Sequence, residues 1–220
     1  MCIFRIAIDG PSGAGKSTIA KAVADALGID YIDTGAMYRA VGFKMDRDGV
    51  PFEEGSELSE MLAGTDIDFV SGNIFLDGVV VNNIIRTPEV SMLAARCSVL
   101  PSVRRKLVEI QRGMGARKSV IMDGRDIGTN VLTDAEYKIF LTASAEERAR
   151  RRCTQLAEMG QTEAAADYES VLADIKQRDY SDITREINPL KKADEAIELD
   201  TTNMSLEEVV AAVMEIVHGG

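Results

Sequence analysis

The glycine-rich run Gly-Pro-Ser-Gly-Ala-Gly-Lys-Ser at residues 10–17 is the feature that most constrains the fold. It matches the pattern G-x-x-x-x-G-K-[ST] completely. A short apolar strand is predicted before it, over Phe4–Asp9, and an amphipathic helix after it, over Ser17–Leu27. In that context the loop amides and the helix N-terminus form a cradle for phosphate groups. We therefore predict a triphosphate site at this loop.

Two side chains of the loop have specific expected roles. Lys16 is placed to reach the outer phosphates, and the Ser17 hydroxyl is placed to contact Mg²⁺. The alternative is an ordinary glycine-rich turn between a strand and a helix, with the lysine exposed to solvent. The loop predicts the fold but leaves the reaction open.

The rest of the chain alternates short apolar strands with helical segments. The further strands are predicted at Ile29–Asp33, Ser119–Asp123, Glu136–Thr142 and Glu195–Asp200. Helices are predicted through Met37 and Val41, capped by Asp33 or Thr34, and at Val90–Cys97, Ser102–Arg112 and Tyr168–Tyr180. This alternation predicts an α/β fold in which a five-stranded parallel sheet is flanked by helices.

Two local patterns stand apart from this alternation. Between Asp66 and Val81, β-branched runs broken by glycine, serine and asparagine predict hairpins, which we interpret as an insert on the main sheet. Capping boxes, in which Ser and Glu satisfy each other's free amides, are predicted for two helices. They are Ser144 with Glu147, and Ser205 with Glu208.

Composition and charge exclude several classes of function. The net charge of −11 argues against a nucleic-acid polymer as partner, because such partners select basic surfaces. His218 is the only histidine and the three cysteines are scattered, which argues against histidine catalysis, disulfides and zinc sites. No apolar run of about eighteen residues appears, so we expect neither membrane insertion nor secretion, but a cytoplasmic protein.

Some charged residues lie at strand ends, where a second phosphate group would bind. Arg125 and Asp126 follow a predicted strand at its carboxyl end, the edge at which open α/β sheets bind ligands. Arg39 lies one turn into the helix after Ile29–Asp33, and a solvated helix arginine is the alternative. Asp123 resembles the acidic strand end that assists Mg²⁺ through water, and an ordinary turn or capping aspartate is the alternative.

Four arginines crowd the start of one helix: Arg148, Arg150, Arg151 and Arg152. Like charges so placed repel unless anions lie nearby, and Glu146 and Glu147 supply only part of the relief. We interpret the segment as a mobile lid whose arginines close onto a transferring phosphoryl group. A solvated charged helix is the alternative.

Arg178, Asp182 and Arg185 share one helical stripe if their helix continues past Tyr180. An ordinary salt-bridge ladder is one explanation. The other is that Asp182 holds the two arginines while it accepts a sugar hydroxyl.

Six motifs of the chain, in this order, resemble those of bacterial cytidylate kinases. They are IAIDGPSGAGKST, DTGAMYRA, EVS with PSVR, VIMDGRDIGT, KIFLTASAEERARRR and RDYSDITREINPL. The resemblance covers nearly the whole chain and implies transfer of the terminal phosphate of MgATP to CMP or dCMP. It implies one domain over residues 1–220, and we expect a monomer. The core would be about 1–40, 115–145 and 190–220. The acceptor-binding insert, about 41–114, would contain a small antiparallel sheet, and the lid would be about 146–189.

The resemblance also implies roles for individual residues. ATP would be bound by Gly10, Pro11, Ser12, Gly13, Ala14, Gly15, Lys16, Ser17 and Thr18, and Mg²⁺ by Ser17 and, through water, Asp123. Transfer would be stabilised by Lys16, Arg148 and Arg152. The acceptor phosphate would be held by Arg39, Arg125 and Arg185, the sugar by Arg178 and Asp182, and the base by Arg104 and Asp126. Thr34 keeps the hydroxyl of a family serine at the substrate, whereas Ala95 lacks the hydroxyl of a serine that contacts the base.

Other functions are open at this stage. A kinase for UMP, dTMP or shikimate is the nearest alternative. A GTPase-like switch would need a guanine-reading Asn-Lys-x-Asp segment, which the chain lacks. A non-catalytic nucleotide sensor would bind ATP without forming ADP in response to CMP.

Overall fold

A computed structural model describes residues 3–70, 72–158, 160–162, 165 and 167–219. The chain divides into two compact units. The first comprises Ile29–Met122 and the N-terminal residues through Phe4, and the second comprises Arg5–Gly28 and the chain from Asp123 onward. The expected lid segment, 146–189, includes residues 159, 163, 164 and 166, which lie outside the described residues.

A five-stranded parallel sheet confirms the predicted α/β class. In spatial order its strands are β2 (Asp30–Asp33), β6 (Val120–Gly124), β1 (Arg5–Asp9), β7 (Tyr137–Thr142) and β8 (Ile197–Asp200). Each strand overlaps the segment predicted for it. β1 pairs with β7 and β7 with β8, both in parallel. The central strands are nearly continuous apolar runs because helices cover both faces of such a sheet.

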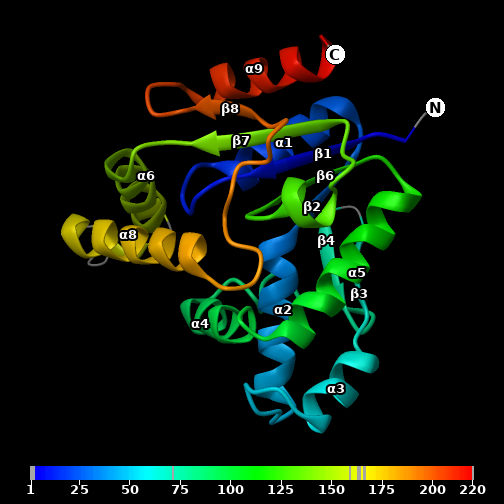
Figure 1. The fold of residues 1–220 in the computed structure, drawn as a ribbon. Helices are drawn as coiled ribbons and strands as arrows, with labels where there is room; N and C mark the ends of the chain where they lie inside the picture. The colour runs from blue at the N-terminus through cyan, green and yellow to red at the C-terminus, as the bar shows by residue number, and fades with distance from the viewer. Residues whose placement is uncertain (1–2, 71, 159, 163–164, 166, 220) are drawn as a thin grey trace. The chain divides into compact units, whose positions relative to one another are not determined.

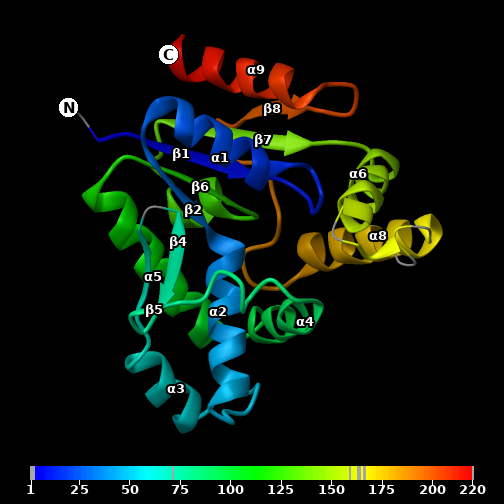
Figure 2. The ribbon, with the colours of Figure 1, turned by 180° about the vertical axis from the view of Figure 1, so that it is seen from behind.

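Within the described residues of the second unit, α1 (Lys16–Leu27) packs against α9 (Leu206–His218), and α6 (Ala145–Glu158) packs against α8 (Tyr168–Thr184) (Figure 1). The apolar faces of α1 and α9 bury Val23 and Val213. α6 lies beside α8 in both views (Figures 1 and 2). Within the described part of the chain, every helix is too short or too polar to span a membrane.

The predicted capping box at α9 is complete. Ser205 Oγ accepts a hydrogen bond from the Glu208 N–H at 3.2 Å, and the Glu208 carboxylate accepts one from the Ser205 N–H at 2.8 Å. Two N–H groups that a helix start leaves unpaired are satisfied in this way.

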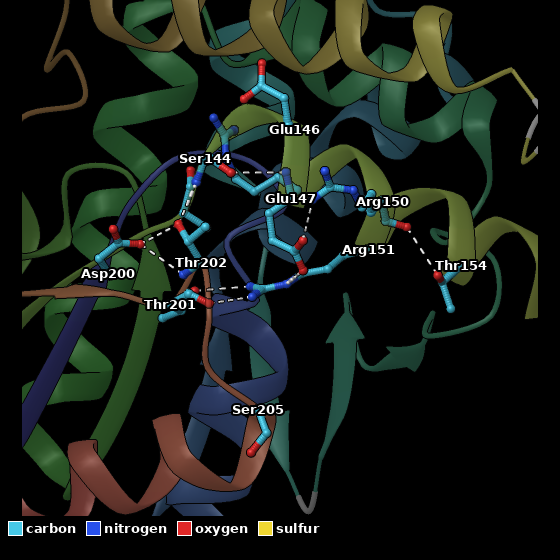
Figure 3. Close-up of polar contacts among 12 residues, drawn as sticks. Ser144, Glu146, Glu147, Arg150, Arg151, Thr154, Asp200, Thr201, Thr202 and Ser205 are labelled. Atoms are coloured by element: carbon cyan, nitrogen blue, oxygen red, sulfur yellow. Dashed lines mark hydrogen bonds and ion pairs between the residues drawn. The ribbon is translucent and has the colours of Figure 1, made fainter.

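The box predicted at Ser144 is only half formed, so that prediction is wrong. Ser144 Oγ accepts from the Glu147 N–H, but the Ser144 N–H donates to Thr202 Oγ1 at 3.0 Å (Figure 3). The Glu147 carboxylate instead pairs with Arg150 and Arg151. Charged partners one turn away compete successfully for the carboxylate, because hydrogen bonds between charged groups are stronger than those to a neutral amide.

The first unit is built on α2 (Thr34–Arg47), which packs against α4 (Pro88–Cys97) and α5 (Pro101–Arg117) (Figure 2). Asp33 caps α2 by accepting a hydrogen bond from the Ala36 N–H at 2.8 Å, one of the two caps expected. A further helix, α3 (Ser56–Ala63), was not predicted. Its eight residues are too few for a clear helical period.

The hairpin segment forms a separate antiparallel sheet of β3 (Ile67–Val70), β4 (Asn73–Leu76) and β5 (Val79–Val80). This confirms the prediction made for residues 66–81. The sheet is joined to α2 by an ion pair between the nearly buried Lys44 ammonium and Asp77, at 2.5 Å. Asp77 has a left-handed φ of 51° in the turn between β4 and β5, a conformation that Asp tolerates better than most residues.

Gly42 lies at the contact between α2 and α4. A Cβ at this position would lie 2.8 Å from the Leu93 carbonyl carbon and 2.9 Å from the Ala94 nitrogen. Both are backbone atoms of α4 and cannot rotate away. The close approach of the two helices therefore requires glycine here.

We expect Gly42→Ala to lower the free energy of unfolding by about 1–3 kcal/mol or more, because the added methyl group overpacks the helix contact. Gly113→Ala in α5 is the matched control, since its added Cβ meets nothing within 4 Å. That variant should be more stable than the wild type by up to about 1 kcal/mol, the helix-propensity difference. Urea unfolding measures both, and a Gly42→Ala variant as stable as Gly113→Ala would contradict the packing argument.

Candidate active site

The loop at residues 10–17 joins β1 to α1, as predicted. Gly10 has a φ of +149°, and a Cβ there would lie 2.0 Å from the Leu141 carbonyl oxygen on β7. Lys16 is only 5% exposed, and its Nζ donates to the Pro11 carbonyl oxygen at 2.8 Å. This burial excludes the alternative of a simple turn with a solvated lysine.

The amine of Lys16 lies in an electrostatically unusual place. Burial lowers the pKa of Lys16 to about 7, and the nearby charge of Arg125 acts in the same direction, while Asp123 and Asp9 oppose it. A bound anion would favour the charged amine. The site is therefore set to bind a polyanion at the N-terminus of α1, where backbone N–H groups add partial positive charge.

Ser17 and Asp123 are brought together although 106 positions separate them in the sequence. The Ser17 hydroxyl donates to Asp123 Oδ2 at 2.8 Å. Both supply hard oxygen atoms, the ligands that Mg²⁺ prefers, and Mg²⁺ commonly takes one or two protein ligands beside phosphates and water. The pair fits a magnesium site of that kind. Among the described residues, no group of three or more His, Cys, Asp or Glu side chains is arranged to hold a metal ion.

Asp9, at the end of β1, is a site residue that the sequence reasoning missed. Its two carboxylate oxygens accept hydrogen bonds from the N–H groups of Ile127 and Gly128, at 2.8 and 2.7 Å. Burial raises the pKa of Asp9 to about 6, although the two N–H bonds oppose the shift. Asp9 thus connects the strand before the loop to the turn that follows β6. A carboxylate directly before the loop, at the end of an apolar strand, was the available signal.

Four charged side chains form an alternating chain behind that turn. Arg125 Nε donates to Asp182 Oδ2 at 2.6 Å, and Arg185 Nη2 donates to Asp126 Oδ1 at 3.0 Å. Arg185 Nη1 also lies 3.8 Å from Asp182 Oδ1. α8 continues past Tyr180 to Thr184, as the stripe required, and Arg185 follows its last residue. Asp182 therefore lies between two arginines of the predicted site.

Arg148, at the start of α6, is enclosed by protein groups. Its guanidinium donates twice to Asp179 of α8, at 3.0 and 2.6 Å, and also to the carbonyl oxygens of Ser12 and Ala143. Asp179 was not among the predicted site residues. Its position beside Arg178 was the only sequence signal for it.

The other arginines of α6 have different surroundings. Arg150 and Arg151 both pair with Glu147, and Arg151 also donates to Thr201 (Figure 3). Arg152 donates to Gln155 Oε1 at 2.7 Å. Burial, followed by the nearby charge of Arg178, lowers the pKa of Arg152. Two neighbouring cations of this kind favour an anion beside them.

The predicted residues of the first unit lie on α2 and α5. Arg39 Nη2 pairs with Asp33 Oδ2 at 3.0 Å, so Arg39 is not a freely solvated helix arginine. Thr34 is buried in the first turn of α2. Arg104 is buried in α5, with its guanidinium 5.9 Å from the centre of the Tyr38 ring.

The parallel sheet, the glycine-rich loop ending in Lys16 and Ser17, and the acidic residue opposite Ser17 define a nucleotide-binding protein of the phosphate-loop class. Comparison with known families makes this more specific. The cytidylate kinase family model matches residues 6–219, and the chain belongs to the cytidylate kinase family. The resemblance of the six motifs is thereby confirmed.

Curated relatives match over nearly their whole length. The cytidylate kinase of Caldicellulosiruptor saccharolyticus is 52% identical over 217 residues, covering 97% of this chain and 95% of that protein. The cytidylate kinase of Carboxydothermus hydrogenoformans is 49% identical, covering 97% of this chain and 97% of that protein. That of Clostridioides difficile is also 49% identical, covering 95% of this chain and 95% of that protein. Among solved structures, an uncharacterized protein from Eubacterium ventriosum matches over the full length of both chains with a TM-score of 0.54. At 12% identity this likeness concerns the fold alone.

We expect the affinity for ATP to fall by up to about tenfold per pH unit above about pH 7. Phosphates raise the pKa of Lys16 on binding, so above about pH 7 the free amine must take up a proton, which costs affinity as the pH rises. Titration calorimetry between about pH 7 and pH 9, in buffers of different ionisation enthalpy, measures the affinity for ATP and the number of protons taken up on binding. Lys16→Arg is the control, because a guanidinium stays charged and should flatten the dependence. A wild-type affinity that is constant between about pH 7 and pH 9 would refute the argument.

Proposed function

We propose that the protein transfers the terminal phosphoryl group of ATP to CMP and dCMP, giving ADP and the nucleoside diphosphate. The observation that carries this proposal is the match to the cytidylate kinase family over residues 6–219. The phosphate loop with its buried Lys16 supports ATP as the donor. The GTPase alternative lacks its guanine-reading segment, and the nearer kinase alternatives are tested below.

On the donor side, residues 10–18 bind the phosphates of ATP. The loop amides and the α1 N-terminus provide fixed dipoles, and Lys16 provides a charge that needs no rearrangement in the transition state. We propose that the ATP is MgATP, with Ser17 and, through water, Asp123 as the protein side of the magnesium site. The ion would neutralise charge on the donor phosphates and orient them.

On the acceptor side, Arg125 and Arg185 hold the phosphate of CMP, together with Arg39 of the first unit. Arg178 and Asp182 bind the sugar, Arg104 and Asp126 recognise the base, and the hydroxyl of Thr34 faces the substrate. The ion pairs of Arg125 with Asp182 and of Arg185 with Asp126 support these assignments, because they hold each guanidinium in one orientation before a ligand arrives. Ala95 removes one possible hydrogen bond to the base. Its loss is worth only about 0.5–1.5 kcal/mol and does not abolish recognition.

The transfer itself needs no general base. The second pKa of a phosphate monoester is about 6, so the attacking oxygen of CMP is already ionised near neutral pH. The protein aligns the two polyanions and excludes water, which would otherwise hydrolyse ATP. Arg152, together with Arg148, stabilises the charge on the moving group, and the proximity of Arg152 to Arg178 supports an anion between them.

We further propose that the chain acts as a cytoplasmic monomer. It would work as one kinase domain, with a core, an acceptor-binding insert at about 41–114 and a lid at about 146–189. The scattered cysteines, of which Cys97 and Cys153 are described as free thiols, support this proposal, because disulfides are rare in the cytoplasm. Light scattering at assay concentration tests the oligomeric state, and a stable dimer would refute the monomer.

We expect ADP formation in a coupled assay to depend on added CMP or dCMP and to be at least roughly tenfold slower with UMP or dTMP. A site that hydrogen-bonds one base strongly disfavours analogues whose donors and acceptors differ. Lys16→Ala, which removes the buried charge at the loop, should abolish the activity and serves as the blank. The proposal would be overturned if ADP formation were fastest with UMP, dTMP or shikimate, or if its rate did not change when any acceptor was added.

We expect Arg125→Ala to lower kcat/KM for CMP by about 10²–10³-fold while the affinity for ATP stays within about threefold. Arg125 donates a hydrogen bond to Asp182, a residue assigned to the acceptor sugar, whereas the residues assigned to the ATP phosphates are those of the loop. The control is Arg150→Ala, which removes a 65% exposed guanidinium from a surface ion pair worth little. An equal loss of ATP binding in Arg125→Ala would contradict the assignment to the acceptor.

A further inference from the structure

The buried guanidinium of Arg148 pairs with the partly buried carboxylate of Asp179. The proposed function gives Asp179 no role. The Arg148 side chain is 5% exposed and the Asp179 side chain 18% exposed. Each carboxylate oxygen accepts one hydrogen bond, at 3.0 Å from Nη1 and 2.6 Å from Nη2. This two-pronged geometry holds the guanidinium plane in one orientation.

Protein groups take most of the hydrogen-bonding capacity of Arg148. Its Nε donates to the Ala143 carbonyl oxygen at 2.9 Å, and Nη1 also donates to the Ser12 carbonyl oxygen at 2.8 Å. With the two bonds to Asp179, four of the roughly five N–H donors of an arginine are used within the protein. These protein partners therefore fix the position of the Arg148 guanidinium before a ligand binds.

The connection joins the donor loop to α8. Ser12 lies in the loop that binds ATP phosphates, and a Cβ on its neighbour Gly13 would lie 3.3 Å from Arg148 Cβ. Asp179 lies on α8, directly after Arg178 and one turn before Asp182. The side chains assigned to the acceptor sugar and the backbone of the donor loop are thus linked through one guanidinium.

We propose that Asp179 is a positioning residue for phosphoryl transfer. It holds Arg148 against the Ser12 carbonyl oxygen, and in this way it fixes α8, with Arg178 and Asp182, relative to the donor loop. The inference rests on the proposed function, because it assigns α8 to the acceptor and the loop to the donor. A displacement of reacting groups by about 1 Å costs roughly 10²-fold in rate, so such a link affects the chemical step more than the binding of either nucleotide.

The test compares Asp179→Asn with the wild type in the CMP-dependent assay. The carboxamide keeps the size of the side chain but turns an NH₂ group toward the guanidinium. We expect kcat to fall by about 10–100-fold, with KM for ATP within about threefold of wild type. The matched control is Asp174→Asn, the same change at an exposed position of α8, which should leave kcat unchanged.

A double variant separates positioning from general stability. If the pair acts as one unit, Arg148→Lys with Asp179→Asn should be no slower than the slower single variant. Multiplied losses would overturn the proposal. So would an Asp179→Asn enzyme that keeps wild-type kcat, or one that loses only thermal stability or substrate affinity.

If Asp179→Asn fails to fold, Asp179→Glu is tested in its place. This variant keeps the carboxylate charge but lengthens the side chain that pairs with Arg148 by one methylene. A reduced kcat with unchanged KM for ATP supports the proposal, and a wild-type kcat refutes it. The wild-type reaction with CMP, measured in the same plates, tests the proposed function separately. If the wild type is active and the Asp179 variants have the same kcat, the role proposed for Asp179 is refuted but the proposed function is not.

Discussion

The buried charge of Lys16 under the glycine-rich loop is the constraint on which the site depends. A primary amine with little access to solvent is costly to keep charged, and the Pro11 carbonyl oxygen and nearby carboxylates lower that cost. The geometry is possible because Gly10 approaches the Leu141 carbonyl more closely than any side chain would allow. The end of β1, the loop and the start of α1 are therefore continuous in the chain and together form the electrostatic environment of Lys16.

A second theme is that each arginine of the site whose ion pair is described pairs with an aspartate, and Asp182 lies near two of them. Arg39 pairs with Asp33, Arg125 with Asp182, Arg185 with Asp126, and Arg148 with Asp179. This arrangement explains how a chain of net charge −11 presents cationic groups to two nucleotides. The carboxylates reduce repulsion among the arginines and hold each guanidinium in place, which lowers the reorganisation needed when phosphates bind. Arg152 differs from these arginines, because burial and the nearby charge of Arg178 both lower its pKa.

Local sequence signals predicted the elements well and the pairing of side chains less well. All five strands of the main sheet, the antiparallel insert and the cap at Asp33 followed from apolar periodicity and capping chemistry. The box at Ser144 failed because Arg150 and Arg151 draw the Glu147 carboxylate away, a competition set by charge and not by spacing. α3 was missed because its eight residues are too few for a clear helical period. The π-helix at Ile127–Val131 was also missed; the N–H groups of its first two residues donate to the carboxylate of Asp9, which is distant in the sequence.

The sequence by itself determined the fold class, the donor loop and the family. Glycine, lysine and serine at this fixed spacing, between a strand and a helix, form a phosphate-binding loop. The sequence also indicated which arginines to consider. Only the tertiary structure decided which carboxylate serves each of them, and it identified Asp9 and Asp179 as members of the site. Those contacts join residues more than 100 and 30 positions apart, and no local pattern encodes a distance that the packing of several elements creates.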